Sequence, residues 1–118
     1  MKQDVKAQWL TALRSGEYAQ GSQRLRRSDD TFCCLGVLCD LAVKAGVIEE
    51  PVQEFNMGSY MYGSQQNSAF LPDEVANWAD VDRFGQKYDD PEAVRDLAKM
   101  NDDGETFEAI ADVIEAAF

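Results

Sequence analysis

Three closely spaced arginines are the residues whose chemistry is easiest to name. Arg24, Arg26 and Arg27 are nearly adjacent, and guanidinium groups clamp phosphate or carboxylate oxygens through paired N–H donors. With Gln20 as a further donor and Tyr18 as a ring that can stack on a base, they form a candidate site for a small anionic nucleotide. No glycine-rich phosphate loop accompanies them. Pairing with acids of this same chain is the alternative interpretation.

Residue types needed for most nucleophilic catalysis are missing. The chain has no histidine, which removes the Ser-His-Asp and Cys-His arrangements and the commonest metal ligand. Cys33, Cys34 and Cys39 lie in one apolar run without a fourth cysteine, so they do not make a structural zinc site. We expect them to be small core residues. The sequence therefore predicts no catalytic residue, no metal site and no cofactor.

The acidic residues form no pattern typical of an active site. Acid/base catalysis needs two carboxyls at a defined separation with different pKa values, and no pair, Glu49-Glu50 included, stands out among 22 acids. Residues 101–104 resemble part of a calcium loop, but its first and twelfth positions would be Lys99 and Ile110, which offer no side-chain oxygen. We predict a helix-to-helix turn at 101–104.

The charge of the chain limits its partners. There are 11 Lys plus Arg against 22 Asp plus Glu, for a formal net charge of −11. Residues 32–118 hold eighteen acidic and five basic side chains, and carry most of the imbalance. Such a surface repels nucleic acid and anionic membranes, so we expect neither as a direct partner. It favours solubility or a basic protein partner.

Length and cysteine content predict one domain, residues 1–118, in a reducing cytoplasm. A chain of 118 residues with 45% hydrophobic residues can build one core. Three cysteines do not suit a disulfide framework. No apolar run approaches the roughly 18 residues of a membrane span, and the N-terminal residues 1–6 are polar rather than typical of a signal peptide.

A buried central helix is the main structural prediction. Residues 32–46 are apolar on nearly every side, which is typical of a helix inside a core. We expect a residue of the segment 29–31 to cap its start and Gly46 to end it. Gly36 is expected to let another element approach closely.

Amphipathic spacing predicts further helices around this centre. Each begins at a capping residue or a proline and carries an apolar stripe. The expected segments are Asp4 to Gly16, Pro72 to residues 80–82, Asp90-Pro91 to Met100, and Thr106 to Phe118.

A short hairpin is a further prediction, with residues 60–62 pairing with residues 69–71. The expected fold is therefore mainly α, with four to five short helices around a buried central one, and α+β if the hairpin forms. Residues 55–70 are also the best candidate for a partner-facing loop. A homodimer contact there is an open alternative.

Two blocks resemble small proteins encoded by bacteriophages and prophages. One is FCCLGVLCDL at residues 32–41, and the other follows the pattern LAxxNDxGxTFxxIAD at residues 97–112. The family that these blocks resemble has no established activity. The resemblance therefore implies an origin in a phage or prophage and a host bacterial cell. Small acidic phage proteins often act on host machinery, which is an association by class only.

The favoured hypothesis is a non-catalytic phage accessory protein that binds a host or phage protein and inhibits a bacterial defence system. The alternatives are a binder that sequesters a small anionic nucleotide, and a carboxylate-dependent enzyme. Contacts to a protein partner are expected from the loop 55–70 and from acids between residues 73 and 115. The residues assigned to this contact are Tyr60, Tyr62, Asp73, Glu74, Asp102 and Asp103.

Overall fold

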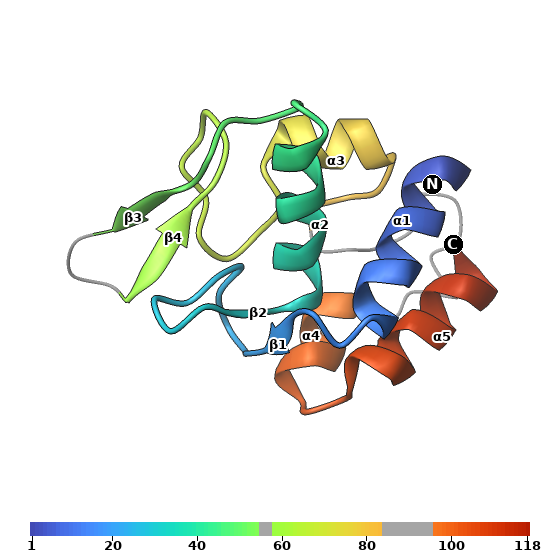
Figure 1. Ribbon diagram of the computed structural model, residues 1–118. Coiled ribbons are helices and arrows are strands. Elements are labelled where there is room, and N and C mark those ends of the chain that lie inside the picture. The colour runs from blue at the N-terminus through green and yellow to red at the C-terminus, as the bar shows by residue number, and fades with distance from the viewer. Residues whose placement is uncertain (55–57, 84–95) are drawn as a thin grey trace.

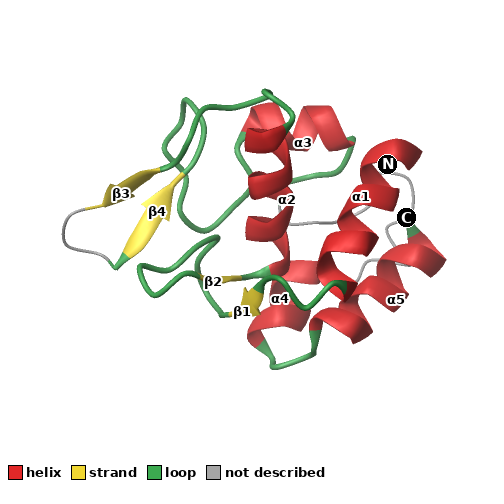
Figure 2. Ribbon diagram, viewed as in Figure 1, coloured by secondary structure: helices red, strands yellow, loops and turns green. Residues whose placement is uncertain are grey.

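Helices predominate over two small sheets in the computed structural model, which describes residues 1–54, 58–83 and 96–118. The helices lie on one side of the view, and the sheet of β3 and β4 lies at the opposite edge (Figure 1, Figure 2). The fold is thus mixed, with a helical core and minor strands. Its elements are α1 (Gln3–Arg14), β1 (Ala19–Gln20), β2 (Thr31–Phe32), α2 (Cys34–Lys44), β3 (Val52–Glu54), β4 (Ser59–Met61), α3 (Asp73–Ala79), α4 (Leu97–Asp102) and α5 (Phe107–Ala117).

The helix α2 lies at the centre of the core, as its apolar run predicted. Residues 34–39 are all buried, and α2 contacts α1, α3 and α4. On α1, the indole Nε1 of Trp9 donates a hydrogen bond to the backbone oxygen of Cys34 at 3.0 Å. This bond satisfies the one polar group of a fully buried side chain. Gly46 ends the helix as predicted, with a φ of +76°.

The start of α2 differs from the prediction. No residue of the segment 29–31 caps it, because Asp29 instead accepts hydrogen bonds from the backbone N and the hydroxyl of Thr31, at 3.2 and 2.7 Å. This is a local turn of the kind that Asp favours. Phe32 belongs to β2, and Cys33 is the N-cap without a side-chain hydrogen bond.

Asn101 supplies the hydrogen bond that the start of α2 needs. Its Oδ1 accepts from the backbone N of Cys34 at 3.1 Å and from Nε2 of Gln20 at 2.9 Å. Its Nδ2 donates to the backbone oxygen of Gly21 at 2.7 Å. The residue is 2% exposed and still belongs to α4, so the predicted helix-to-helix turn begins only after it, at residues 103–104. Asn101 thereby joins three segments that are distant in sequence.

Gly36 is where α2 meets the connector between residues 16 and 31. An added Cβ would lie 1.7 Å from the backbone oxygen of Leu25, so only glycine fits, as predicted. Leu25 is fully buried, and its backbone N donates to the oxygen of Ser68 at 2.7 Å. The contact with Gly36 therefore fixes the middle of the connector against the core.

The strand β4 has a different partner from the one predicted. It pairs antiparallel with β3, with Val52 opposite Met61, and residues 69–71 form no strand. Tyr62, directly after β4, exchanges two backbone hydrogen bonds with Asn67, at 2.8 and 3.0 Å. That tight turn closes before residues 69–71 are reached, which leaves no register for the predicted hairpin.

The start of α1 also differs from the prediction, and the structure describes only the last part of the helix expected to end at Met100. The helix α1 begins at Gln3, so Asp4 lies in its first turn and is not its cap, although the helix does stop before Gly16 (φ +78°). The helix α4 begins after Asp96, whose side chain accepts a hydrogen bond from a backbone N of the first turn. The start predicted at residues 90–91 lies outside the described residues.

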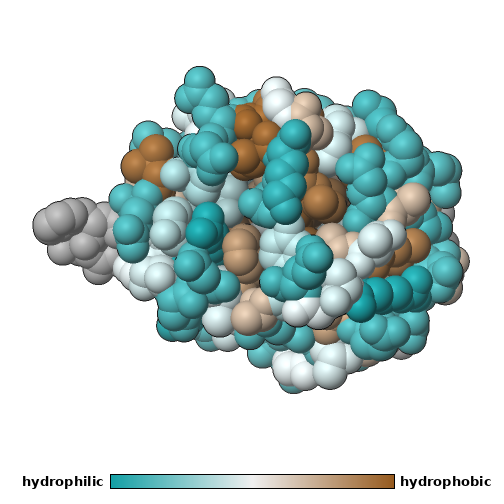
Figure 3. Space-filling view, in the orientation of Figure 1, coloured by the Kyte–Doolittle hydropathy of each residue, from teal (hydrophilic) through white to brown (hydrophobic). Residues whose placement is uncertain are grey.

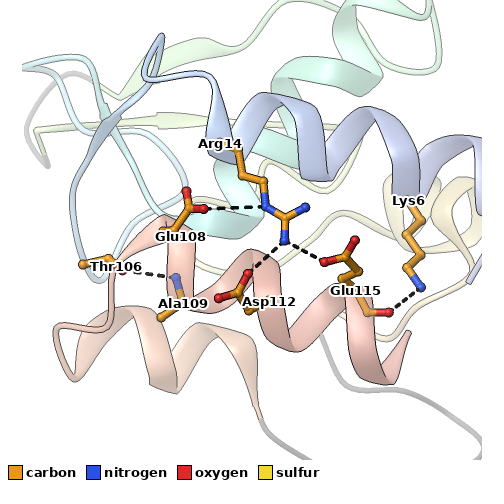
Figure 4. A network of polar contacts seen from close by, with 7 residues as sticks. All are labelled: Lys6, Arg14, Thr106, Glu108, Ala109, Asp112 and Glu115. Carbon is orange, nitrogen blue, oxygen red and sulfur yellow. Dashed lines mark hydrogen bonds and ion pairs between the residues drawn. The ribbon is translucent and has the colours of Figure 1, made fainter.

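The helix α5 packs along α1 through an apolar face and a charged edge. Thr106 caps α5 as predicted, and its hydroxyl accepts from the backbone N of Ala109 at 3.1 Å. Figure 4 shows the guanidinium of Arg14, on α1, reaching across to a stripe of carboxylates on α5. Its partners are Glu108 at 3.9 Å, Asp112 at 2.9 Å and Glu115 at 2.9 Å.

Candidate functional site

The arginine loop, defined here as residues 22–30, lies against β4. The backbone N of Ser28 donates to the oxygen of Gly58 at 2.8 Å, and the backbone N of Tyr60 donates to the oxygen of Arg26 at 2.9 Å. These bonds hold the loop beside the strand, while the packing of Leu25 on α2 holds it from below. The loop is therefore positioned by the core on one side and by β4 on the other.

Arg26 is fixed between two aromatic rings. Its guanidinium carbon lies 4.2 Å from the ring centroid of Tyr60 and 5.3 Å from that of Phe32, and its Nη2 lies 2.7 Å from Oδ1 of Asp30. Tyr18 packs edge-on against Phe32, with ring centroids 5.1 Å apart. Each cation–π contact of this kind contributes about 0.5–2 kcal/mol. Arg26 thus joins the loop to β4, and its pairing with Asp30 agrees with the alternative interpretation of the arginines.

Arg24 and Arg27 differ from Arg26 in their environment. Among the carboxylates of described side chains, a set without Glu54, none lies within 4.0 Å of either guanidinium, whereas Arg14 and Arg26 both form ion pairs. Both side chains instead line a concavity of about 310 Å³. The remaining lining residues of this concavity are Gln23, Ser28, Asp29 and Gly58.

The other two predicted ligand residues lie away from this concavity. The side chain of Gln20 is engaged by the C-terminal helices, since its Nε2 donates to Asn101 and its Oε1 accepts from the backbone N of Phe107 at 3.1 Å. The hydroxyl of Tyr18 donates to the carboxylate of Asp40. Burial, followed by this hydrogen bond, raises the pKa of Tyr18. The five predicted ligand residues therefore do not converge, and only Arg24 and Arg27 share a concavity.

The two tyrosines assigned to a protein partner are largely inside the molecule. Tyr62 is fully buried, and burial raises its pKa far above the ordinary value. Its ring therefore belongs to the core. Tyr60 is half-buried, with one face covered by the guanidinium of Arg26. Of the loop 55–70, residues 55–57 lie outside the described residues.

Acids near the C-terminus are exposed but largely engaged within the chain. Oδ1 of Asp102 accepts from the backbone N of Gln23 at 2.8 Å, and Asp103 pairs with Nζ of Lys99 at 2.7 Å. The carboxylate stripe of α5 is shared with Arg14 (Figure 4). These acids contribute to the negative field of the molecule and also hold the helices together.

A hollow beside β3 and β4 gathers carboxylates and apolar side chains in one place. We call it the acidic hollow; its volume is about 390 Å³. Val52, 57% exposed, lies at its strand side. In Figure 3, brown apolar atoms interrupt a mostly hydrophilic surface over α2 and toward the two strands. The lining residues are Val47, Ile48, Glu49, Glu50, Val52, Met61, Gly63, Ser64, Gln66 and Glu74.

The start of α3 places one of the predicted contact residues, Glu74, at this hollow; Asp73, its neighbour in the chain, is not among the lining residues. Glu74 accepts a hydrogen bond from the backbone N of Ser64 at 2.9 Å, and this bond lowers the pKa of Glu74, so it is ionised at neutral pH. Asp73, which is exposed, accepts from Nε2 of Gln65 at 3.0 Å. Glu49 and Glu50 are exposed, and sequence reasoning had set them aside as one carboxylate pair among many. In the sequence these two acids stand between the apolar residues 47–48 and Val52, but nothing local indicates that Glu74 joins them.

The cysteines within residues 1–54, 58–83 and 96–118 lie in the core. All three thiols are free and buried, as expected of core residues. Burial raises the pKa of Cys33 to about 11, so its thiol is protonated at neutral pH and is a poor nucleophile. In the same part of the chain, no group of three or more Cys, Asp or Glu residues is placed to hold a metal ion.

Comparison with known proteins gives a family but no activity. None of the helices in the described part combines the length and the apolar character that a bilayer crossing requires. No curated protein and no solved structure matches the chain significantly. A family model described as a domain of unknown function matches residues 1–118. The chain therefore belongs to this family, the domain of unknown function DUF8296.

Proposed function

We propose that this protein is a non-catalytic accessory protein of a phage or prophage, and that it binds a basic segment of a host or phage protein in the acidic hollow. The observation that carries the proposal is the composition of the hollow, in which three carboxylates line the same concavity as apolar residues, of which Val52 is 57% exposed. Inhibition of a bacterial defence system, in the host cytoplasm, is the role that we assign to this binding. The resemblance to small phage proteins supports that assignment by class.

Apolar contact would supply part of the binding energy. Val52 is 57% exposed. A partner that removes this apolar side chain from water gains binding free energy. Covering it fully would contribute about 1 kcal/mol, since complete burial of a valine is worth about 1.5–3 kcal/mol. Lysine and arginine side chains of a partner suit such a surface, because their aliphatic stems pack on apolar groups while their charged ends reach carboxylates.

Charge would supply specificity and a high association rate. Glu49, Glu50 and Glu74 place three negative charges at the hollow, and the whole chain carries a formal charge of −11. Complementary charge raises association rates and disfavours partners of the wrong sign. The paired acids of α4 and α5 would act at long range in this scheme, and the hollow would make the direct contacts.

Photo-crosslinking tests this location. Benzoylphenylalanine placed at Val52 is expected to capture a discrete protein from an extract of the bacterial host, whereas the same group at Gln8, exposed on the distant helix α1 (Figure 1), is not. The captured protein is then identified by mass spectrometry. Equal capture from both positions, or capture from Gln8 alone, would contradict binding at the acidic hollow.

A further inference from the structure

We propose that the concavity lined by Arg24 and Arg27 binds the phosphate group of a small phosphorylated ligand. This site is separate from the acidic hollow, since the two share no lining residue. Its volume of about 310 Å³ is at the lower end of the range of about 300–1,000 Å³ typical of small-molecule pockets. The volume therefore suits a small ligand.

The unpaired state of the two guanidinium groups is the first argument. The chain holds twice as many acidic as basic side chains, so an arginine readily finds a carboxylate, as Arg14 and Arg26 do. Arg24 and Arg27 form no ion pair within 4.0 Å among the side chains that the structure describes, which do not include that of Glu54. Two cations that line one concavity without a direct ion pair form a ready site for an external anion.

The loop geometry is the second argument, because it presents the two side chains on the same concavity. Arg26, between them, is held elsewhere by the ring of Tyr60. Nη1 of Arg24 donates to the backbone oxygen of Gln23 at 2.9 Å, which orients the group and uses one of its five N–H donors. Nη1 of Arg27 lies 3.5 Å from the backbone oxygen of Ser22. Most donors of both groups are left for a ligand.

The remaining lining residues set the charge of the ligand. Asp29 also lines the concavity, and hydrogen bonds from Thr31, with the nearby charge of Arg27, lower its pKa. It is therefore ionised, and it leaves the site with a net charge of about +1. A single phosphate suits this balance better than a triphosphate chain does. Ser28, which lines the same concavity, offers a neutral hydroxyl donor.

Thermal unfolding with defined probes tests the site. Inorganic phosphate and adenosine monophosphate are each expected to raise the melting temperature, and unphosphorylated adenosine is not. A larger shift with the nucleotide would identify an organic phosphomonoester as the ligand, and equal shifts would identify phosphate alone. Both results support a phosphate site. No shift with either phosphorylated probe at millimolar concentration would overturn the proposal.

A pair of charge-matched variants separates the site from general anion effects. The double variant Arg24→Gln/Arg27→Gln is expected to bind the responding probe at least about tenfold more weakly, because charge-assisted hydrogen bonds are lost. Lys2→Gln/Lys99→Gln changes the net charge equally at exposed positions outside the concavity and is expected to keep the affinity. Equal weakening in both doubles would overturn the proposal. Circular dichroism of each variant confirms that it is folded.

Discussion

Replacing Gly36 with alanine is expected to lower the free energy of unfolding by about 3 kcal/mol or more. An added Cβ would lie 1.7 Å from the backbone oxygen of Leu25 and 2.5 Å from its carbonyl carbon. These are backbone atoms, which cannot rotate aside as a flexible side chain can, and overpacking of this severity exceeds the usual cost of about 1–3 kcal/mol. Because small proteins have about 5–15 kcal/mol in total, the variant should melt far earlier or fail to fold.

Urea unfolding of Gly36→Ala beside Gly46→Ala measures this effect with an internal control. Gly46 has a φ of +76° but no atom within 4 Å of an added Cβ, so alanine there meets backbone strain alone, about 1 kcal/mol. The difference between the variants isolates the steric contact with Leu25. Equal losses would show that Gly36 is not the close approach that positions the arginine loop.

Replacing Asn101 with leucine is expected to cost about 3 kcal/mol of stability. The change removes three hydrogen bonds and leaves the backbone N of Cys34 and the backbone oxygen of Gly21 without the partner that Asn101 gives them. Each buried polar group that loses its partner costs about 1–3 kcal/mol. The hydrogen bonds that are lost join α4 to the start of α2 and to the segment that carries β1.

Thermal or urea unfolding of Asn101→Leu is compared with that of Asn77→Leu. Asn77 is exposed on α3, and a surface substitution of this kind is usually within about 0.5 kcal/mol of neutral. A loss of stability for Asn101→Leu as small as that of the control would mean that water or a neighbouring side chain satisfies both backbone groups. Asn101 would then not be needed to hold the three segments together.

Those parts of the fold that depend on local sequence were predictable. The apolar run around Gly36, the stops at Gly16 and Gly46 and the cap at Thr106 follow from helix periodicity and capping chemistry, and the structure confirms them. The predicted hairpin failed because of a local turn between Tyr62 and Asn67, whereas the start of α2 depends on a partner far away in the chain. The start of α2 is satisfied by Asn101, 67 residues later, and no local pattern reveals such a bond.

In the candidate sites, too, what is local in the sequence was predictable and what depends on the folded chain was not. The arginines were recognisable as a group, but the direction of each side chain depends on tertiary neighbours: Arg26 is drawn between Phe32 and Tyr60, while Arg24 and Arg27 line a concavity. The acidic hollow could not be read from sequence, because its carboxylates come from the segment 47–52 and from α3. Only the folded chain brings these together.

The affinity of the captured partner for two charge-matched variants tests the acidic hollow most directly. Glu49→Lys/Glu50→Lys reverses two charges at the hollow, and Glu17→Lys/Glu105→Lys reverses two exposed charges outside it. By isothermal titration calorimetry we expect the first to weaken binding by at least about 100-fold, since like charges facing each other cost several kcal/mol. The second should change it by less than about tenfold, through the altered net charge alone. Equal weakening by the two variants, or no weakening by the first, would contradict binding of a basic partner in the acidic hollow.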